Sequence, residues 1–156
     1  MKNQRAPQSS ILNPQIMFNP SRDEARNFLF ETWRKRVAGA LLTPLEDLTA
    51  QLIEKHPEYH ALLAQPEAHL DKDYTPESGA TNPFLHLMMH LTIEEQISIN
   101  QPPGIRAHFV RLTHQFESEH DAQHQMMECL SEMIWQAQRH GTPPDAAVYL
   151  DCLTAH

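Results

Sequence analysis

The residues with the clearest chemical potential are histidines and glutamates that share one spacing, His-x3-His-x3-Glu, which occurs twice in the chain. The two copies comprise His86, His90 and Glu94, and His120, His124 and Glu128. Residues four apart on an α-helix lie on one face, one turn above the other. Imidazole nitrogens and carboxylate oxygens on adjacent turns can converge on a single ion. The doubled pattern therefore predicts a metal centre built by two helices.

Two other interpretations of these histidines stay open: a hydrogen-bonded network in the core, or a polar face in contact with water. Exposure to water fits the 83–98 segment poorly, because its apolar residues occur all around the helical wheel. These residues are Phe84, Leu87, Met88, Met89, Leu91, Ile93 and Ile97. We therefore expect His86 and His90 to be buried, and buried imidazoles need polar or metal partners.

The donor types narrow the choice of ion. Four imidazoles with one or two carboxylates suit zinc or non-haem iron better than calcium or magnesium, and six such ligands could hold two ions. An ion with an open position could activate water or dioxygen, with Glu128 or Glu94 as the base. A metal-dependent hydrolase and an oxygen-reactive di-iron protein both fit, and the sequence establishes no enzymatic activity. Of a third pair, which straddles a helix start, His60 is a reserve ligand and His56 ranks below it.

The competing interpretation is a non-enzymatic interaction module, in which the histidines form a buried network or a pH-sensitive seam. Residues 1–19 mix prolines and polar residues with isolated apolar side chains, which predicts an irregular arm. Such an arm could pack on the body or on a second copy of the chain, so a homodimer is possible. The small-molecule substrate of an enzymatic version is unknown.

Helices must position these residues, and the sequence predicts no other regular element. Apolar residues recur at helical spacing, and no segment alternates with period two. The predicted helices cover about 21–38, 44–56, 57–63, 83–98, 104–115 and 118–140, followed by a short one after 142–145. We predict an all-α fold, a single-domain helical bundle of six to seven helices over residues 20–156.

Capping signals support these boundaries. Ser21, Thr43 and Ser118 each precede an acidic residue by three positions, the spacing of a capping box. Gly141 follows the longest predicted helix, where glycine commonly ends a helix in the left-handed conformation. The polar stretch 65–81 is predicted to be a long loop, and long ordered loops are often functional.

Composition excludes some classes of function. The chain has 156 residues with 12 Lys+Arg against 20 Asp+Glu, a formal charge of −8, so it lacks the basic surface of a nucleic-acid-binding protein. No apolar run approaches the roughly 18 residues of a membrane span, and no signal-peptide core follows Met1. Cys129 and Cys152 form no disulfide framework and fit a reducing cytosol, with Cys129 as a core thiol. We expect a cytoplasmic protein.

Several segments together resemble one known family. They are Asn82-Pro83-Phe84-Leu85-His86, His90, Glu95-Gln96, Gln101-Pro102-Pro103-Gly104-Ile105 and Met127-Glu128-Cys129-Leu130. On these residues the chain resembles, over roughly residues 18–154, the proteobacterial family catalogued as domain of unknown function 1841. The resemblance implies a small bacterial cytosolic protein and no particular activity.

The resemblance and the helix spacing favour different acidic ligands. The family pattern carries an acid at Glu95, whereas Glu94 lies on the His90 face of the predicted helix. A local π-bulge could turn Glu95 toward the site, or Glu95 could serve as a buried cap or support a ligand from behind. Both glutamates therefore stay candidates.

Overall fold

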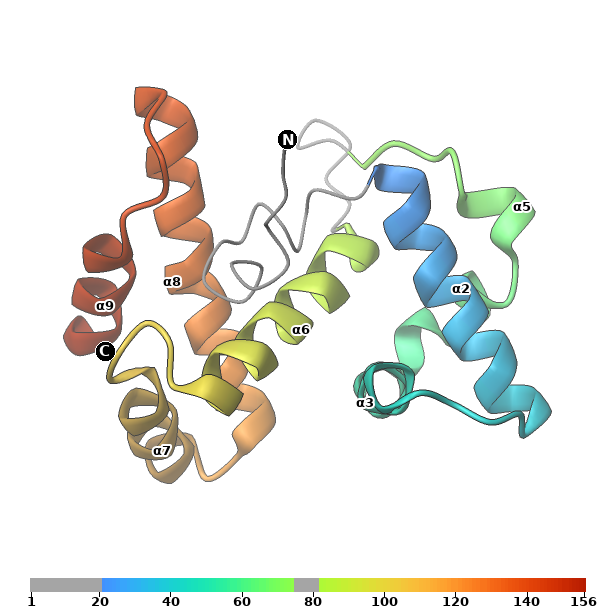
Figure 1. Ribbon diagram of the computed structural model, residues 1–156, viewed down its shortest axis with the longest axis horizontal. Helices are drawn as coiled ribbons and strands as arrows, with labels where there is room; N and C mark the ends of the chain where they lie inside the picture. The colour runs from blue at the N-terminus through green and yellow to red at the C-terminus, as the bar shows by residue number, and fades with distance from the viewer. Residues whose placement is uncertain (1–20, 75–81) are drawn as a thin grey trace, which may run out of the picture. The chain divides into compact units, whose positions relative to one another are not determined.

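The computed structural model describes residues 21–74 and 82–156, and the predicted arm at residues 1–19 lies outside them. The described residues form eight α-helices and one 3₁₀-helix with no strand, which confirms the all-α prediction. The elements are α2 (Arg22–Ala38), α3 (Pro44–Glu54), η2 (Pro57–Tyr59), α4 (His60–Leu63), α5 (Pro66–His69), α6 (Pro83–Ile99), α7 (Ile105–Phe116), α8 (Glu119–His140) and α9 (Ala146–Ala155) (Figure 1). None of these helices is both long and apolar enough to cross a membrane.

The predicted count of six to seven helices is slightly too low, and the difference lies between α3 and α6. The 57–63 segment divides into η2 and α4, and α5 forms inside the predicted 65–81 loop. Pro57 and Pro66 each occupy the start of one of these pieces. Proline ends the preceding helix and is compatible with a new first turn, so this stretch becomes a series of short helices. Residues 75–81 of the loop lie outside the described part of the chain.

Helix ends follow the local signals in the sequence. Complete capping boxes form at Ser21 and at Thr43, each with its glutamate three residues later. The side chain of Asn82 accepts hydrogen bonds from the first turn of α6, including the Phe84 N–H at 3.0 Å. Gly141 ends α8 with φ 63°, in the left-handed region that glycine tolerates best. These contacts involve neighbours in sequence, which is why they could be predicted.

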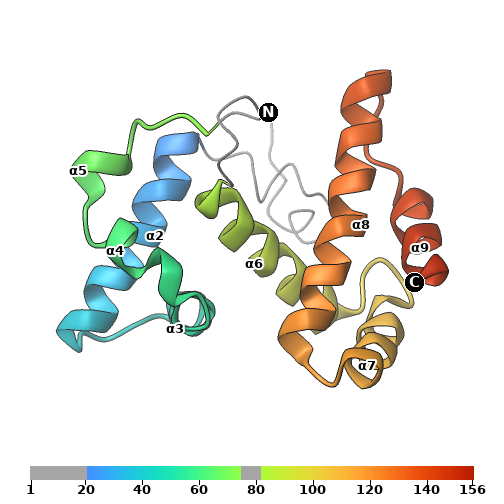
Figure 2. The same ribbon diagram turned by 180° about the vertical axis from the view of Figure 1, so that it is seen from behind.

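The chain divides into two compact units, one up to Leu91 and one from Thr92, so the division falls within α6. The predicted single-domain organisation of residues 20–156 stays a prediction. The first unit contains α2, α3, α4 and the first half of α6 (Figure 2). These helices share a core of Leu29, Phe30, Leu52, Ile53, Leu63, Phe84, Leu87, Met88 and Leu91. Side-chain nitrogens of Lys35 and Arg36 lie 2.8 Å and 3.0 Å from carboxylates on α3, so part of the basic run of α2 joins two helices.

In the second unit, α9 runs alongside α8, and α7 packs against both (Figure 1). Its buried residues include Ile105, Leu112, Met126, Leu130, Met133, Tyr149 and Leu153. Two polar contacts hold α9 in addition to this core. The Tyr149 hydroxyl donates to Gln96 Oε1 at 2.7 Å, and Arg111 donates to the Leu153 carbonyl at 2.8 Å.

The prediction that Cys129 and Cys152 stay separate thiols is wrong. In the structure they form a disulfide that joins α8 to α9, with their Cα atoms 5.5 Å apart. The cysteines are 23 residues apart in sequence and meet only because α9 folds back along α8. Their number and spacing alone therefore carried no information about the bond.

Arg26 on α2 is almost completely buried although it carries a charge, with 2% of its surface exposed. Its Nη1 donates to the His69, Leu70 and Lys72 carbonyl oxygens at 3.1, 2.8 and 2.7 Å. The guanidinium carbon also lies 4.4 Å from the centre of the Phe84 ring. Arg26 therefore joins the end of α5 and the segment after it to the core of the first unit through hydrogen bonds.

We expect Arg26→Met to lower the free energy of unfolding by about 1–3 kcal/mol, because it preserves apolar volume but leaves three partly buried carbonyls without their donor. Urea denaturation followed by circular dichroism measures the change. Arg34→Met is the matched control, since Arg34 lies on the same helix in an exposed pair with Glu31. Its effect should stay within about 0.5 kcal/mol. Equal effects of the two substitutions would contradict the role of Arg26.

Tyr149 should make the stability of the folded protein depend on pH in the alkaline range. Burial raises the pKa of Tyr149 in the folded protein. The unfolded chain, with a tyrosine pKa of about 10, loses this proton first, so the free energy of unfolding should fall as the pH rises above about 10. Tyr149→Phe should make this fall less steep and cost about 1–2 kcal/mol at neutral pH, because Gln96 loses its donor. Denaturation curves between pH 7 and 11 test this, and an unchanged slope in the variant would refute it.

Candidate metal centre

Three histidines of the first unit come together from two elements that are far apart in sequence. His56 follows α3 and immediately precedes Pro57 at the start of η2. His86 and His90 lie one turn apart on α6, as their spacing predicted. His56 and His90 are buried, with 2% and 0% of their surfaces exposed, and His86 is partly buried. The expected burial of the α6 pair is confirmed fully for His90 and in part for His86.

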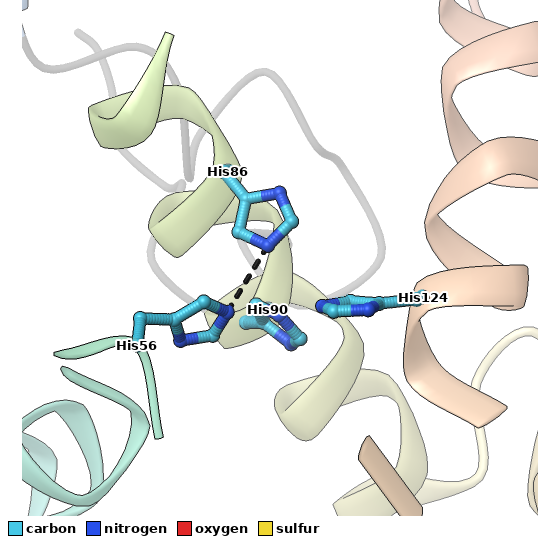
Figure 3. Close-up of side chains that lie close together, drawn as sticks. All are labelled: His56, His86, His90 and His124. Carbon is cyan, nitrogen blue, oxygen red and sulfur yellow. Dashed lines mark hydrogen bonds between the residues drawn. The ribbon is translucent and has the colours of Figure 1, made fainter. Parts of the chain in front are cut away.

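The three rings point toward one another (Figure 3). Nε2 of His56 lies 3.1 Å from Nε2 of His86. The three pairs of ring centres, His56 with His86, His56 with His90, and His86 with His90, are each 4.9 Å apart. One ligand nitrogen of each ring lies within 4.8 Å of the others. We call these three residues the histidine triad.

The protonation of His56 follows from its backbone partner. Nδ1 of His56 lies 2.8 Å from the Leu52 carbonyl oxygen, which can only accept a hydrogen bond, so Nδ1 carries the proton. In the neutral ring, Nε2 then holds a lone pair, and this nitrogen faces His86. A backbone carbonyl bonded to one ring nitrogen, with the other nitrogen directed at the metal, is the usual arrangement for a metal-binding histidine.

The distances suit a small transition-metal ion. Two nitrogens bound to one tetrahedral zinc lie roughly 3.3 Å apart, since zinc–nitrogen bonds are about 2.0–2.1 Å long. The 3.1 Å between the Nε2 atoms of His56 and His86 is close to this value. One ring nitrogen of His90 lies within 4.8 Å of those of His56 and His86, so binding one ion would require the His90 ring to move closer to them. The triad therefore has the donor type and the spacing for an ion.

The surroundings of the triad are apolar and aromatic. The ring of Tyr59 stacks on that of His56 at 5.4 Å between centres, with an angle of 2° between planes. Burial, and then the charge of Glu58, raise the pKa of the Tyr59 hydroxyl. Because His56 and His90 are buried, an ion bound to them would be held in a medium of low dielectric constant.

His60, the predicted reserve ligand, lies outside the triad. Its Nε2 bonds the Ile53 carbonyl oxygen at 2.8 Å, and its ring packs on Trp33 with centres 4.4 Å apart. The structure brings together His56 and the α6 pair instead. The sequence favours His60 over His56 as a ligand, and the structure reverses this order. The bend between α3 and η2 at Pro57, rather than helical spacing, sets the direction of each side chain. The proline after His56 was the available signal.

The metal ligands predicted in the second unit stay predictions. The rings of His120 and His124 on α8 pack edge to face with centres 4.2 Å apart, as expected for residues one turn apart. Glu128 is exposed, and the Glu94 carboxylate accepts a hydrogen bond from Gln123 at 2.7 Å. Burial raises the pKa of Glu95. The α-helical bonding of α6 continues through Glu95, so the proposed π-bulge is not present there.

Comparison with known proteins extends the resemblance noted in the sequence. The model of the family described as "Domain of unknown function (DUF1841)" matches residues 21–155, which include the histidine triad and every helix described above. No curated protein and no solved structure matches the chain significantly. Because the family model covers most of the sequence, the chain belongs to the family described as domain of unknown function (DUF1841).

Proposed function

We propose that this protein binds a transition-metal ion through His56, His86 and His90. The observation that carries the proposal is the orientation of His56, whose Nδ1 bonds the Leu52 carbonyl while Nε2 lies 3.1 Å from Nε2 of His86. An ion at this point would take the place of the proton that the two Nε2 atoms share. His86 would then coordinate through the same nitrogen that donates that proton in the metal-free form.

Zinc or iron fits the triad best. Imidazole is a borderline ligand that favours zinc, copper, nickel and iron over calcium and magnesium, which prefer oxygen. The group contains no carboxylate, so three neutral rings leave the full positive charge on the ion. A di-iron site of the ferritin type uses several carboxylates, which makes one ion the better supported number.

The chemistry of a bound ion depends on how many protein ligands complete its shell. Three nitrogens leave a position for water on zinc, and zinc lowers the pKa of bound water to about 7. The centre could then supply a hydroxide for hydrolysis. The sequence predicts His124 on α8 as a further ligand. A fourth protein nitrogen of this kind would fill the shell of a four-coordinate ion, and the centre would then be structural.

A second candidate is a metal-free hydrogen-bonded network that stabilises an interaction module. The contact between the Nε2 atoms of His56 and His86 favours it, because a proton on His86 satisfies both nitrogens without an ion. This candidate predicts that the triad supports stability equally well in the presence of a chelator.

Metal analysis of the untagged protein decides between the two candidates. We expect at least about half an equivalent of zinc or iron per chain, or stoichiometric uptake after reconstitution. His56→Ala should lose this metal and His60→Ala should retain it, because only His56 belongs to the triad. The two variants are matched, since each removes one imidazole from the same short segment. Less than a tenth of an equivalent, with no uptake, would overturn the proposal.

Cobalt substitution then tests the coordination shell. The visible absorption of Co²⁺ separates four-coordinate from six-coordinate sites and shifts when an added anion displaces bound water. An anion-sensitive spectrum supports an open, reactive ion. His124→Ala tests the predicted fourth ligand: it should change the spectrum only if α8 completes the shell.

A further inference from the structure

A second group of metal-binding side chains lies within the second unit. Cys129 on α8 and Cys152 on α9 have one ligand atom each within 4.8 Å of the other and of a His156 nitrogen. Cys152 and His156 are four residues apart, so they stand one turn apart at the end of α9. Cys129 is fully buried, Cys152 is partly buried and His156 is exposed. In the structure the two sulfurs are joined as a disulfide.

The position of α9 does not depend on the disulfide alone. Tyr149 anchors the first half of the helix to Gln96, and both side chains are buried. Arg111 holds the other end through the Leu153 carbonyl. Breaking the sulfur–sulfur bond leaves these contacts intact, so both thiols should remain near each other and near His156.

We propose that reduction converts this disulfide into a zinc site formed by Cys129, Cys152 and His156. A dithiol reductant supplies two electrons and two protons, becomes a disulfide itself and leaves two thiols on the protein. Zinc then displaces both thiol protons and binds two thiolates and one imidazole, with water in the fourth position on the exposed side. Two thiolates neutralise the ion, which makes its binding next to the buried Cys129 favourable.

The two states of this pair exclude each other, because a sulfur in a disulfide has no thiolate to donate. Zinc occupancy would therefore report the redox state of the surroundings. Thiolates select zinc over calcium and magnesium, so the site should discriminate among divalent ions by ligand softness. This site shares no residue with the histidine triad and does not depend on metal binding there.

Cobalt distinguishes the two sites, because only a thiolate ligand gives a sulfur-to-cobalt charge-transfer band in the near ultraviolet. We expect this band when Co²⁺ is added without oxygen to the full chain reduced by a phosphine, and no band in the oxidised chain. Added zinc should remove it. His156→Ala should weaken binding by about tenfold or more. His140→Ala, which removes an exposed histidine at the end of α8, should leave the affinity unchanged.

A reduced wild-type chain without the band would overturn the proposal, as would equal affinities of His156→Ala and the wild type. Cys152→Ser should also abolish the band. The His156 variant keeps the test valid if the serine variant fails to fold, because His156 is exposed. The same experiment with His86→Ala should give the same band, because His86 belongs to the histidine triad and not to this site. The test therefore reports metal binding at the cysteines whether or not the histidine triad binds an ion.

Discussion

His90→Ala should abolish metal binding at the triad and lower the free energy of unfolding by about 3 kcal/mol or more when metal is present. Binding to the folded state alone stabilises it by about 2.7 kcal/mol at a free ion concentration 100 times Kd. His90 is completely buried on α6, so its removal also leaves space in the core. Chemical denaturation with saturating zinc, compared with denaturation in a chelator, measures both contributions.

A double-mutant comparison separates the metal from ordinary packing. With zinc present, His56→Ala together with His90→Ala should cost clearly less than the sum of the two single changes, because the stabilisation by the ion is lost only once. His114→Ala, at an exposed position of α7, is the control and should change stability by at most about 0.5 kcal/mol. Losses that add fully, and that are the same with and without chelator, would show that the histidines act as independent core residues.

Reducing the Cys129–Cys152 disulfide should lower the free energy of unfolding by about 3 kcal/mol in zinc-free buffer, as expected from the chain entropy of closing a loop of this length. The bonded residues are 23 apart and lie on α8 and α9. Urea denaturation of the full chain with and without a phosphine measures the difference, and a chelator keeps zinc from replacing the bond.

Cys152→Ser is the control for this measurement. The variant should have the stability of the reduced wild type and should not respond to the phosphine. Thiol titration under denaturing conditions gives an independent result. In the purified wild type, neither Cys129 nor Cys152 should react as a free thiol. Two free thiols, together with a denaturation curve that the reductant does not move, would contradict the bond between the helices.

The sequence by itself determined the all-α class, most helix boundaries and the placement of histidines in pairs along α6 and α8. Each of these rests on interactions within a few residues. Ser21 and Thr43 cap the helices that follow them through bonds to residues three positions later. His86 and His90 face the same way because one helical turn separates them. Local contacts of this kind are the same in any tertiary structure that keeps the helix.

Only the tertiary structure decided which side chains meet across elements. His56 joins the α6 pair, and His60 does not, because the turn at Pro57 points the two imidazoles in different directions. Cys129 and Cys152 are bonded because α9 packs against α8. These contacts depend on how separate helices bury their apolar faces against each other. That packing is a sum of many small terms spread over the chain, and no spacing rule within one segment contains it.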